Sequence, residues 1–283
     1  MQNNYTMISN IQNNSINFNT HNININHKNK EIIYIVGDNF NEFSQSNYVI
    51  TLSKFIHYIK DINKKSNNNL YYLGQGLSKS EKEIIIKYSV DYQFPVYLPE
   101  NRLASESKDT HKTKKENILI TCPQKIHNDL YQSHLIIDDS CAEMSDHVTG
   151  RHIQGMVLIE AARQMMLAIS EKFILDYNNK GNFYCIWSNI VTKFNHFLFP
   201  IDVIIKHYIT QIERHNNGTI KLKSITKFIQ NNKVCSDIEI EYKLFNKYIM
   251  KKIEEEIAEK NLQNFSYKIK EKFIQVSSIE NMS

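Results

Sequence analysis

Residues 146–164 read "DHVTGRHIQGMVLIEAARQ", and this stretch decides the fold class. From about Gly155 onward its apolar residues lie on almost every side of a helix, which indicates a helix that is buried nearly all round. Four segments rich in β-branched and aromatic residues follow it: "FYCIWSNIVTKFNHFLFP", "VIIKHYITQIER", "TIKLKSITKFI" and "VCSDIEIEYKLF". One apolar helix followed by an antiparallel meander predicts an α+β domain whose sheet wraps around the helix.

The segments around this domain suggest where its boundaries lie. "ILIT" and "DLYQSHLIID" precede the helix as two expected strands, and Asn217-Gly218 predicts a hairpin turn between two of the later strands. Upstream, "EIIYIVGD", "NYVITLSKFIHYIKDI", "LYYLGQG" and "SKSEKEIIIKYSVDY" alternate as strand, helix, strand and helix, with Ser78 or Ser80 as the expected N-cap of the last helix. We therefore expect a flexible Asn-rich tail over 1–30, a small β-α-β-α unit over 31–98, an exposed linker over 99–116, the helix-and-sheet domain over 117–250, and an amphipathic, solvated C-terminal helix and tail over 251–283.

Composition argues against several classes of protein. The net charge of +4 is small and its basic residues are scattered, which gives no electrostatic footprint for nucleic acid or a membrane surface. No stretch approaches the ~20 apolar residues that span a bilayer, and the N-terminus lacks the pattern of a secretory signal. The four cysteines form no CxxC pair. We expect a cytoplasmic protein that binds neither nucleic acid nor membrane.

Three polar residues stand out on the apolar helix. Glu160, Arg163 and Gln164 are spaced by three and four residues, so they share one stripe of the helix. A buried charge is costly unless it is paired, and Glu160 and Arg163 are obvious partners. The stripe is therefore either a structural ion pair or one wall of a pocket.

The residues just before the helix favour a pocket. Gly155 at the helix start allows close approach of a ligand, and the N–H groups of the first turn suit an anion or a thioester carbonyl. His147 and His152 lie in the loop that leads to this point, and a histidine can transfer a proton near neutral pH. The residues alone leave a site and an ordinary surface loop open.

The whole stretch resembles the signature of the A-factor biosynthesis hotdog family, in which a "DH" pair is followed by "HxxGM", an aliphatic run and "EAARQ". The similarity extends over about 117–246 and implies a hotdog fold, with the apolar helix enclosed by the sheet. It also implies fatty acyl thioesters as ligands, on acyl carrier protein or coenzyme A, and a homodimer. The best-known members transfer a β-ketoacyl group to dihydroxyacetone phosphate during γ-butyrolactone synthesis.

The resemblance also assigns roles to residues. Compared with hotdog dehydratases, Glu160 falls on the catalytic carboxylate position and His147 falls within one residue of the catalytic histidine. We expect these two as acid/base or orienting groups, and we expect the following residues to bind substrate: His152, Gly155, Met156, Arg163 and Gln164. No metal and no cofactor beyond the pantetheine of the substrate is expected. Three features depart from the family: Gln154 replaces a common proline, the "DH" pair is shifted by one residue, and only one repeat of the signature is present.

Other patterns leave further alternatives. "LGQGLSKS" lies between a strand and a helix like a phosphate loop, but it lacks the glycine and lysine pattern of either known type and is typical of a simple βα turn. The pair His147 and His152 could begin a metal site, and Cys141 could be a nucleophile. The expected function is acyl transfer in signal or secondary-metabolite synthesis, with a hydroxyacyl-thioester dehydratase, a thioesterase or a non-catalytic acyl-binding module as alternatives.

Overall fold

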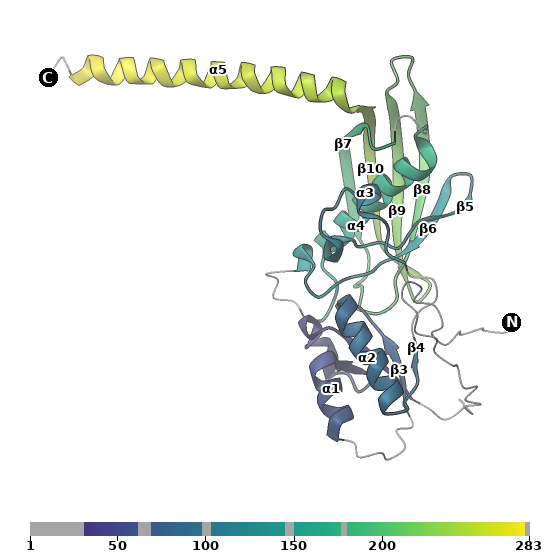
Figure 1. The fold of residues 1–283 in the computed structure, drawn as a ribbon. Helices are drawn as coiled ribbons and strands as arrows, with labels where there is room; N and C mark the ends of the chain where they lie inside the picture. The colour runs from purple at the N-terminus through teal and green to yellow at the C-terminus, as the bar shows by residue number, and fades with distance from the viewer. Residues whose placement is uncertain (1–30, 62–68, 98–102, 145–149, 177–179, 281–283) are drawn as a thin grey trace.

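The computed structural model describes residues 31–61, 69–97, 103–144, 150–176 and 180–280. These residues form two sheets with their helices and one long C-terminal helix (Figure 1). The tail expected over residues 1–30 lies outside the described residues. Short helical turns cover Asp38–Phe40, Phe43–Gln45, Lys115–Asn117 and Ala142–Met144, and one π-helical turn covers Ser170–Ile174.

The larger sheet is antiparallel and packs against the apolar helix α4 (Gly155–Ile169). Its six strands run in the order β5-β6-β8-β9-β10-β7, with bounds β5 Gln124–His127, β6 Leu130–His134, β7 Phe183–Phe194, β8 Ile204–Arg214, β9 Ile220–Gln230 and β10 Lys233–Asn246. The predicted hotdog arrangement is confirmed. One detail differs: residues 118–121, expected as a strand, make only isolated bridges, and the first strand of the sheet forms after them at β5.

Tight turns set the register of the long strands. Gly218 has a φ of +80° in the turn between β8 and β9, where Asn217 Oδ1 accepts a hydrogen bond from the Thr219 N–H. Asn231 and Asn232, with φ of 50° and 60°, join β9 to β10. Glycine and asparagine tolerate this left-handed conformation, so the turns form where the local sequence favours them.

The N-terminal unit contains the alternating strands and helices that were expected, and its strands form a parallel sheet. Its strands run in the order β2-β1-β3-β4, with bounds β1 Ile32–Val36, β2 Val49–Thr51, β3 Leu70–Leu73 and β4 Val96–Tyr97, and its helices are α1 Leu52–Asp61 and α2 Lys79–Asp91. Residues 49–51 were expected in a helix but pair with residues 34–36, because Val, Ile and Thr favour a strand when a partner strand is available. Ser78 caps α2 through a reciprocal capping box with Glu81.

The loop after β3 docks this unit onto the hotdog sheet. The Gln75 side chain donates to the Leu135 carbonyl at 2.9 Å and accepts from the Ile137 N–H at 2.8 Å. The Gly76 N–H donates to the Ile137 carbonyl at 3.0 Å. A Cβ on Gly37 would lie 1.7 Å from the Gly76 carbonyl oxygen, so two backbones pass each other there without room for side chains. "LGQG" is thus a βα turn used for docking between the two units.

Residues 103–119 differ from the exposed linker expected over 99–116. They include the short helix α3 (Ser107–Thr110), and Ser105, Asp109 and Thr110 are buried. This segment contacts α4 on its polar stripe, in the layer drawn in front of the sheet in Figure 1. It is a cover over the helix, and two of its charged residues, Asp109 and Lys112, are held by partners that are distant in sequence.

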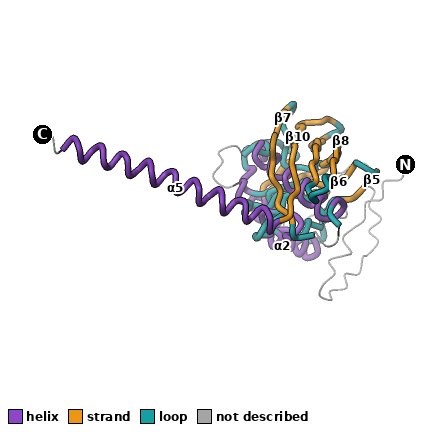
Figure 2. Tube along the Cα trace, turned by 90° about the horizontal axis from the view of Figure 1, so that it is seen from above, coloured by secondary structure: helices purple, strands orange, loops and turns teal. Residues whose placement is uncertain are grey.

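Helix α5 (Lys247–Glu280) follows β10 and extends away from the rest of the molecule (Figures 1 and 2). Its side chains are exposed or half-buried throughout the part whose side chains are described. This agrees with the solvated helix that was expected from the charged sequence. None of the described helices has the length and apolar character needed to cross a membrane.

Candidate functional site

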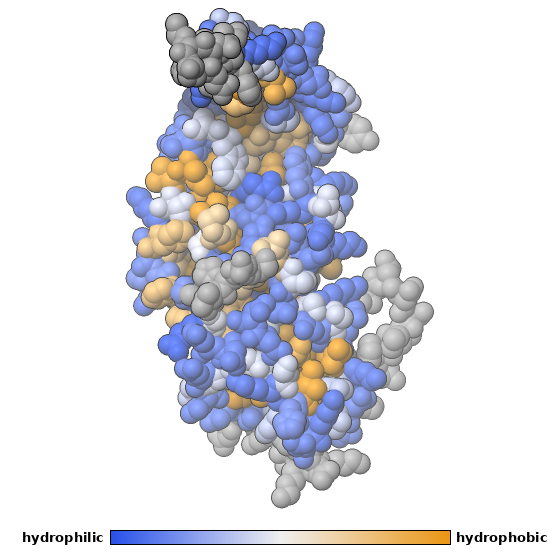
Figure 3. All heavy atoms as spheres, turned by 90° about the vertical axis from the view of Figure 1, so that its left-hand side faces the viewer, coloured by the Kyte–Doolittle hydropathy of each residue, from blue (hydrophilic) through white to orange (hydrophobic). Residues whose placement is uncertain are grey.

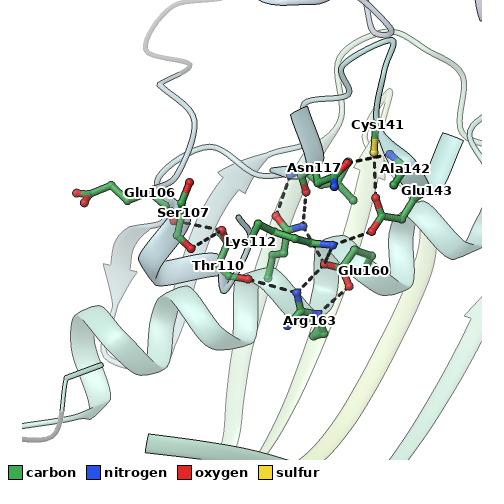
Figure 4. Close-up of polar contacts among 12 residues, drawn as sticks. Glu106, Ser107, Thr110, Lys112, Asn117, Cys141, Ala142, Glu143, Glu160 and Arg163 are labelled. Carbon is green, nitrogen blue, oxygen red and sulfur yellow. Dashed lines mark hydrogen bonds and ion pairs between the residues drawn. The ribbon is translucent and has the colours of Figure 1, made fainter. Parts of the chain in front are cut away.

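The polar stripe of α4 is an ion-pair network. Arg163 donates to both carboxylate oxygens of Glu160, from Nε and from an Nη, each at 2.7 Å (Figure 4). Lys112, from the covering segment, lies with its Nζ 2.9 Å from Glu160 Oε1 and 2.8 Å from a carboxylate oxygen of Glu143. Gln164 Nε2 also donates to Glu160 at 3.0 Å. The Glu160 carboxylate therefore has partners on both of its oxygens.

The same stripe holds the covering segment through the backbone. Gln164 is fully buried; its side-chain oxygen accepts from the Leu119 N–H and its Nε2 donates to the Asn117 carbonyl, both at 2.8 Å. Arg163 donates to the Thr110 carbonyl at 3.3 Å. Figure 4 shows these groups converging between α4 and the segment above it. The stripe thus faces protein, whereas a pocket wall was the alternative expected from the sequence.

The charges of the network fix its protonation. Burial by itself would raise the pKa of Glu160, but hydrogen bonds and charge from Arg163, Gln164 and Lys112 outweigh it and hold that pKa below its usual value. Burial disfavours the charged form of Lys112, yet its contacts with Glu143 and Glu160 raise its pKa. Both groups stay charged at neutral pH, so this arrangement suits orientation better than proton transfer.

At the start of α4, in contrast to the ion-pair network, a buried polar group lacks a partner among the described residues. Gln154 is the N-cap residue, but its side chain makes no capping hydrogen bond. The residue is 5% exposed, and its Nε2 has no hydrogen-bond partner among the residues that the structure describes. The first N–H groups of any α-helix lack an acceptor within the helix. A buried amide donor and the positive end of a helix therefore lie next to each other, and each can take an oxygen acceptor.

Aromatic side chains surround this helix start. A Cβ on Gly155 would lie 2.7–3.4 Å from the ring carbons of Phe194, so the glycine allows that ring to pack on the backbone. Met156, Phe194 and Phe197 are 64%, 58% and 69% exposed. Figure 3 shows hydrophobic surface on the face of the molecule on which β7 lies. An apolar surface is thus exposed next to the group of polar donors.

The loop before the helix is held by the N-terminal unit and by the segment between β7 and β8. The Gly150 carbonyl accepts from the Phe43 N–H at 3.1 Å, Arg151 donates to the Gln45 side chain at 2.9 Å, and the Ile153 N–H donates to the Leu198 carbonyl at 2.7 Å. The His152 ring packs against the Phe197 ring, with centroids 4.8 Å apart and the planes tilted by 49°. His147 lies outside the described residues.

The structure thus divides the expected site residues into two groups. His152, Gly155 and Met156 lie together at the helix start, while Glu160, Arg163 and Gln164 lie in the network under the covering segment. Sequence analysis missed Lys112 and Phe194. Lys112 carries no signal because it lies in a polar segment far from α4 in the chain, and Phe194 looks like any strand aromatic.

The alternative chemistries find little support in the described residues. Cys141 is buried and donates to Glu143, and burial raises its pKa to about 12, so it is a poor nucleophile at neutral pH. No group of three His, Cys, Asp or Glu residues within the described part of the chain is placed to hold a metal ion. At the "LGQG" turn, Glu81 lies over the start of α2 in the capping box, where it would repel a phosphate.

The chain was compared with solved structures, with curated protein sequences and with protein-family models. Solved structures similar to the chain include a mutant thioesterase from Pseudomonas aeruginosa (10% identity, 45% of this chain and 81% of that chain, TM-score 0.34), a thioesterase from Haemophilus influenzae (12%, 45% and 79%, 0.33) and an uncharacterized protein from Pyrococcus horikoshii (15%, 50% and 92%, 0.32). No curated protein sequence matches the chain. The family model of the A-factor biosynthesis hotdog domain matches residues 105–246, half of the chain, and its match begins in the covering segment. The chain therefore belongs to the A-factor biosynthesis hotdog domain family.

Proposed function

We propose that this protein binds an acyl thioester at the start of α4 and transfers the acyl group in the synthesis of a signal molecule or secondary metabolite. The thioester is carried by acyl carrier protein or coenzyme A. The family supports the ligand class, and Gln154 carries the assignment of the position.

Gln154 and the first turn of α4 offer donors for a carbonyl oxygen. The Gln154 Nε2 is buried without a partner among the described residues, and the N–H groups at Gly155 and after it carry the positive end of the helix dipole. Such donors stabilise the oxyanion that forms when a nucleophile attacks a thioester carbonyl. The proline that is common at this position in the family has no side-chain amide, so Gln154 adds a donor that a proline lacks.

The apolar surface beside this point fits the acyl chain. Met156, Phe194 and Phe197 are exposed there and could cover several methylene groups, each of which contributes about 0.8 kcal/mol when buried. β7 is the edge strand of the sheet, and Ile186, Ile190 and Val191 on it are also exposed. We propose that a second copy pairs at this edge, which would enclose the acyl chain between two protomers.

The proposed reaction is acyl transfer to a hydroxyl group. The acceptor oxygen attacks the thioester carbon and its proton passes to His147. The C–S bond then breaks, and the leaving thiolate takes that proton from His147, which gives an ester and a free thiol. Glu160 acts here as an orienting group, because four hydrogen bonds or ion pairs from Arg163, Lys112 and Gln164 hold it charged. His147 remains the proposed acid/base group.

A non-catalytic acyl-binding module is the second candidate. The engagement of Glu160 by cations favours it, because the dehydratase-type role needs a carboxylate that can release or take a proton. Dehydratase and thioesterase activity are therefore less consistent with the network than acyl transfer or binding alone.

The decisive experiment incubates the protein with β-ketoacyl, hydroxyacyl and saturated acyl thioesters of pantetheine, with a hydroxyl acceptor, and follows masses and free thiol. We expect binding of acyl thioesters and turnover of the β-ketoacyl compound. Binding with no turnover of any thioester would leave the binding module, and no binding would overturn both candidates.

Gln154→Leu tests the position of the carbonyl. Loss of one hydrogen bond to the ligand is expected to weaken binding about tenfold, while the free energy of unfolding changes little because the amide has no protein partner to lose. Gln124→Leu, at an exposed position on β5, is the matched control and should bind normally. Unchanged binding by Gln154→Leu would place the carbonyl elsewhere.

A further inference from the structure

Helix α5 carries exposed apolar side chains. Its 34 residues leave the body after β10, and Figures 1 and 2 show it projecting away from the rest of the chain. Leu262 and Phe265 are 62% and 63% exposed on it. Most of the stability of a helix in water comes from packing of an apolar face, so a partner for this helix is physically favoured.

The apolar residues of its outer part follow a heptad pattern. Ala258, Leu262, Phe265 and Ile269 are spaced by four, three and four residues, and all four are exposed. This is the spacing of the a and d positions of a coiled coil, with Leu262 and Ile269 at a. The family match ends at residue 246, so this helix lies outside the part of the chain that the family model covers.

The apolar residues of the inner part face another way. Ile253 and Leu262 are nine residues apart, which places them on opposite sides of a helix with 3.6 residues per turn. Near the inner end, Glu254 accepts a hydrogen bond from Tyr184 on β7. The inner turns therefore belong to the attachment of the helix, and the heptad stripe begins beyond them.

Charge selects both the partner and its direction. Extending the heptad by one position at each end places Glu255 at a and Lys272 at d, and both are exposed. In a parallel pair of identical helices Glu255 would face Glu255 and Lys272 would face Lys272, which is repulsive. In an antiparallel pair Glu255 meets the partner's Lys272, Ala258 meets the partner's Ile269, and Leu262 meets the partner's Phe265. A second copy in antiparallel orientation therefore satisfies the apolar and the charged positions together.

We propose that α5 pairs with α5 of a second copy of this chain as an antiparallel coiled coil over residues 255–272. This contact is separate from the β7 edge and does not depend on acyl binding. It holds two hotdog domains at opposite ends of the helix pair, because each helix leaves its own body at residue 247 and points toward the other.

Cross-linking of the full chain tests the orientation. E255C and K272C proteins are prepared separately, mixed and oxidised, with the unsubstituted chain as background because Cys122 is exposed. We expect the mixed disulfide between E255C and K272C, and little disulfide from either protein alone. Efficient cross-linking of E255C to itself would indicate a parallel pair and overturn the proposal.

Sedimentation of full-length variants tests the stripe. Leu262→Glu should lower the mass of the assembly to that held by the β7 edge alone, with unchanged thermal unfolding of the hotdog domain. Lys272→Glu should weaken association, and Glu255→Lys combined with Lys272→Glu should restore it. Ile253→Glu, on the opposite side of the helix, is the control and should associate normally. A chain that stays unpaired through α5 at all concentrations, or whose α5 binds lipid vesicles instead, would refute the proposal.

Discussion

The two polar regions of α4 differ in whether their groups have partners. On the polar stripe, Glu160, Arg163 and Gln164 form hydrogen bonds and ion pairs with one another, with Lys112 and with the backbone of the covering segment. At the helix start, Gln154 is also buried, with 5% of its surface exposed, but its amide donor has no partner among the described residues. Both regions are polar residues in an apolar helix, and the sequence alone does not separate them.

This difference separates the polar residues of the helix that have a structural role from those that are candidates for ligand binding. Buried polar groups are nearly always paired, so a paired group is explained by the fold and an unpaired one calls for another explanation. By this criterion the polar stripe fastens the covering segment, and the helix start is the position that we propose for a ligand oxygen. The following predictions test which of these residues stabilise the fold and which act on a ligand.

The largest loss of stability is expected for a substitution on the polar stripe. Glu160→Ala leaves Arg163 and Lys112 without their shared carboxylate, which should lower the free energy of unfolding by about 3–5 kcal/mol in a urea titration. Glu160→Gln, which keeps the shape and some hydrogen bonds, should cost less. Normal stability of Glu160→Ala together with loss of acyl turnover would assign the stripe to catalysis instead.

His207 tests whether an unpaired group alone marks a ligand site. It is fully buried on β8, its Nδ1 lies 2.8 Å from the Thr226 hydroxyl, and its Nε2 has no partner among the described residues. Burial lowers its pKa to about 3. It lies inside the core, so we expect it to affect folding and not acyl binding.

The pH dependence follows from that pKa. The unfolded chain takes up a proton on this histidine below about pH 6.5 while the folded chain does not, so stability falls as the pH drops, by about 3 kcal/mol between pH 7 and pH 4. His207→Leu should remove this part of the acid sensitivity, measured as the difference between the two stability curves. Parallel curves for the two proteins would show that His207 is protonated or solvated in the folded state.

A smaller effect is expected where Phe194 packs on Gly155. The methyl group of Gly155→Ala would lie 2.7 Å from the outer end of the Phe194 ring, and this exposed side chain can move aside, so the substitution should displace the ring from the helix start at a cost of at most about 1 kcal/mol of stability. Phe194→Ala combined with Gly155→Ala should recover the stability that the clash cost. Additive effects of the two substitutions in thermal unfolding would mean that the ring and the glycine are not in contact.

The smallest effect is expected at the rim of the network. Glu143→Gln removes one charge that Lys112 contacts, but Lys112 keeps Glu160, so the loss should be within about 1 kcal/mol. The same urea titration measures it beside Glu160→Ala. A loss as large as that of Glu160→Ala would mean that Lys112 is held mainly by Glu143.

Much of the fold was predictable because it depends on sequence patterns among neighbouring residues. The all-round apolar character of α4, the alternation along β8 to β10 and the Asn217-Gly218 turn each depend on residues close in sequence. The strand β2 was missed because three β-branched residues before a helix look like part of the helix until a partner strand is in place. Domain boundaries remain a proposal beyond the region of the family match.

The amino-acid sequence alone was enough to predict the helix-and-sheet domain, the alternation of strands and helices in the N-terminal unit, and a polar stripe on the helix with a glycine at its start. Only the tertiary structure decided that residues 105–119 cover the stripe, that Lys112 joins it, and that the Gln154 amide is left without a partner. The physical reason is that periodicity reports which side of an element is apolar, whereas hydrogen-bond partners depend on segments brought together from distant parts of the chain.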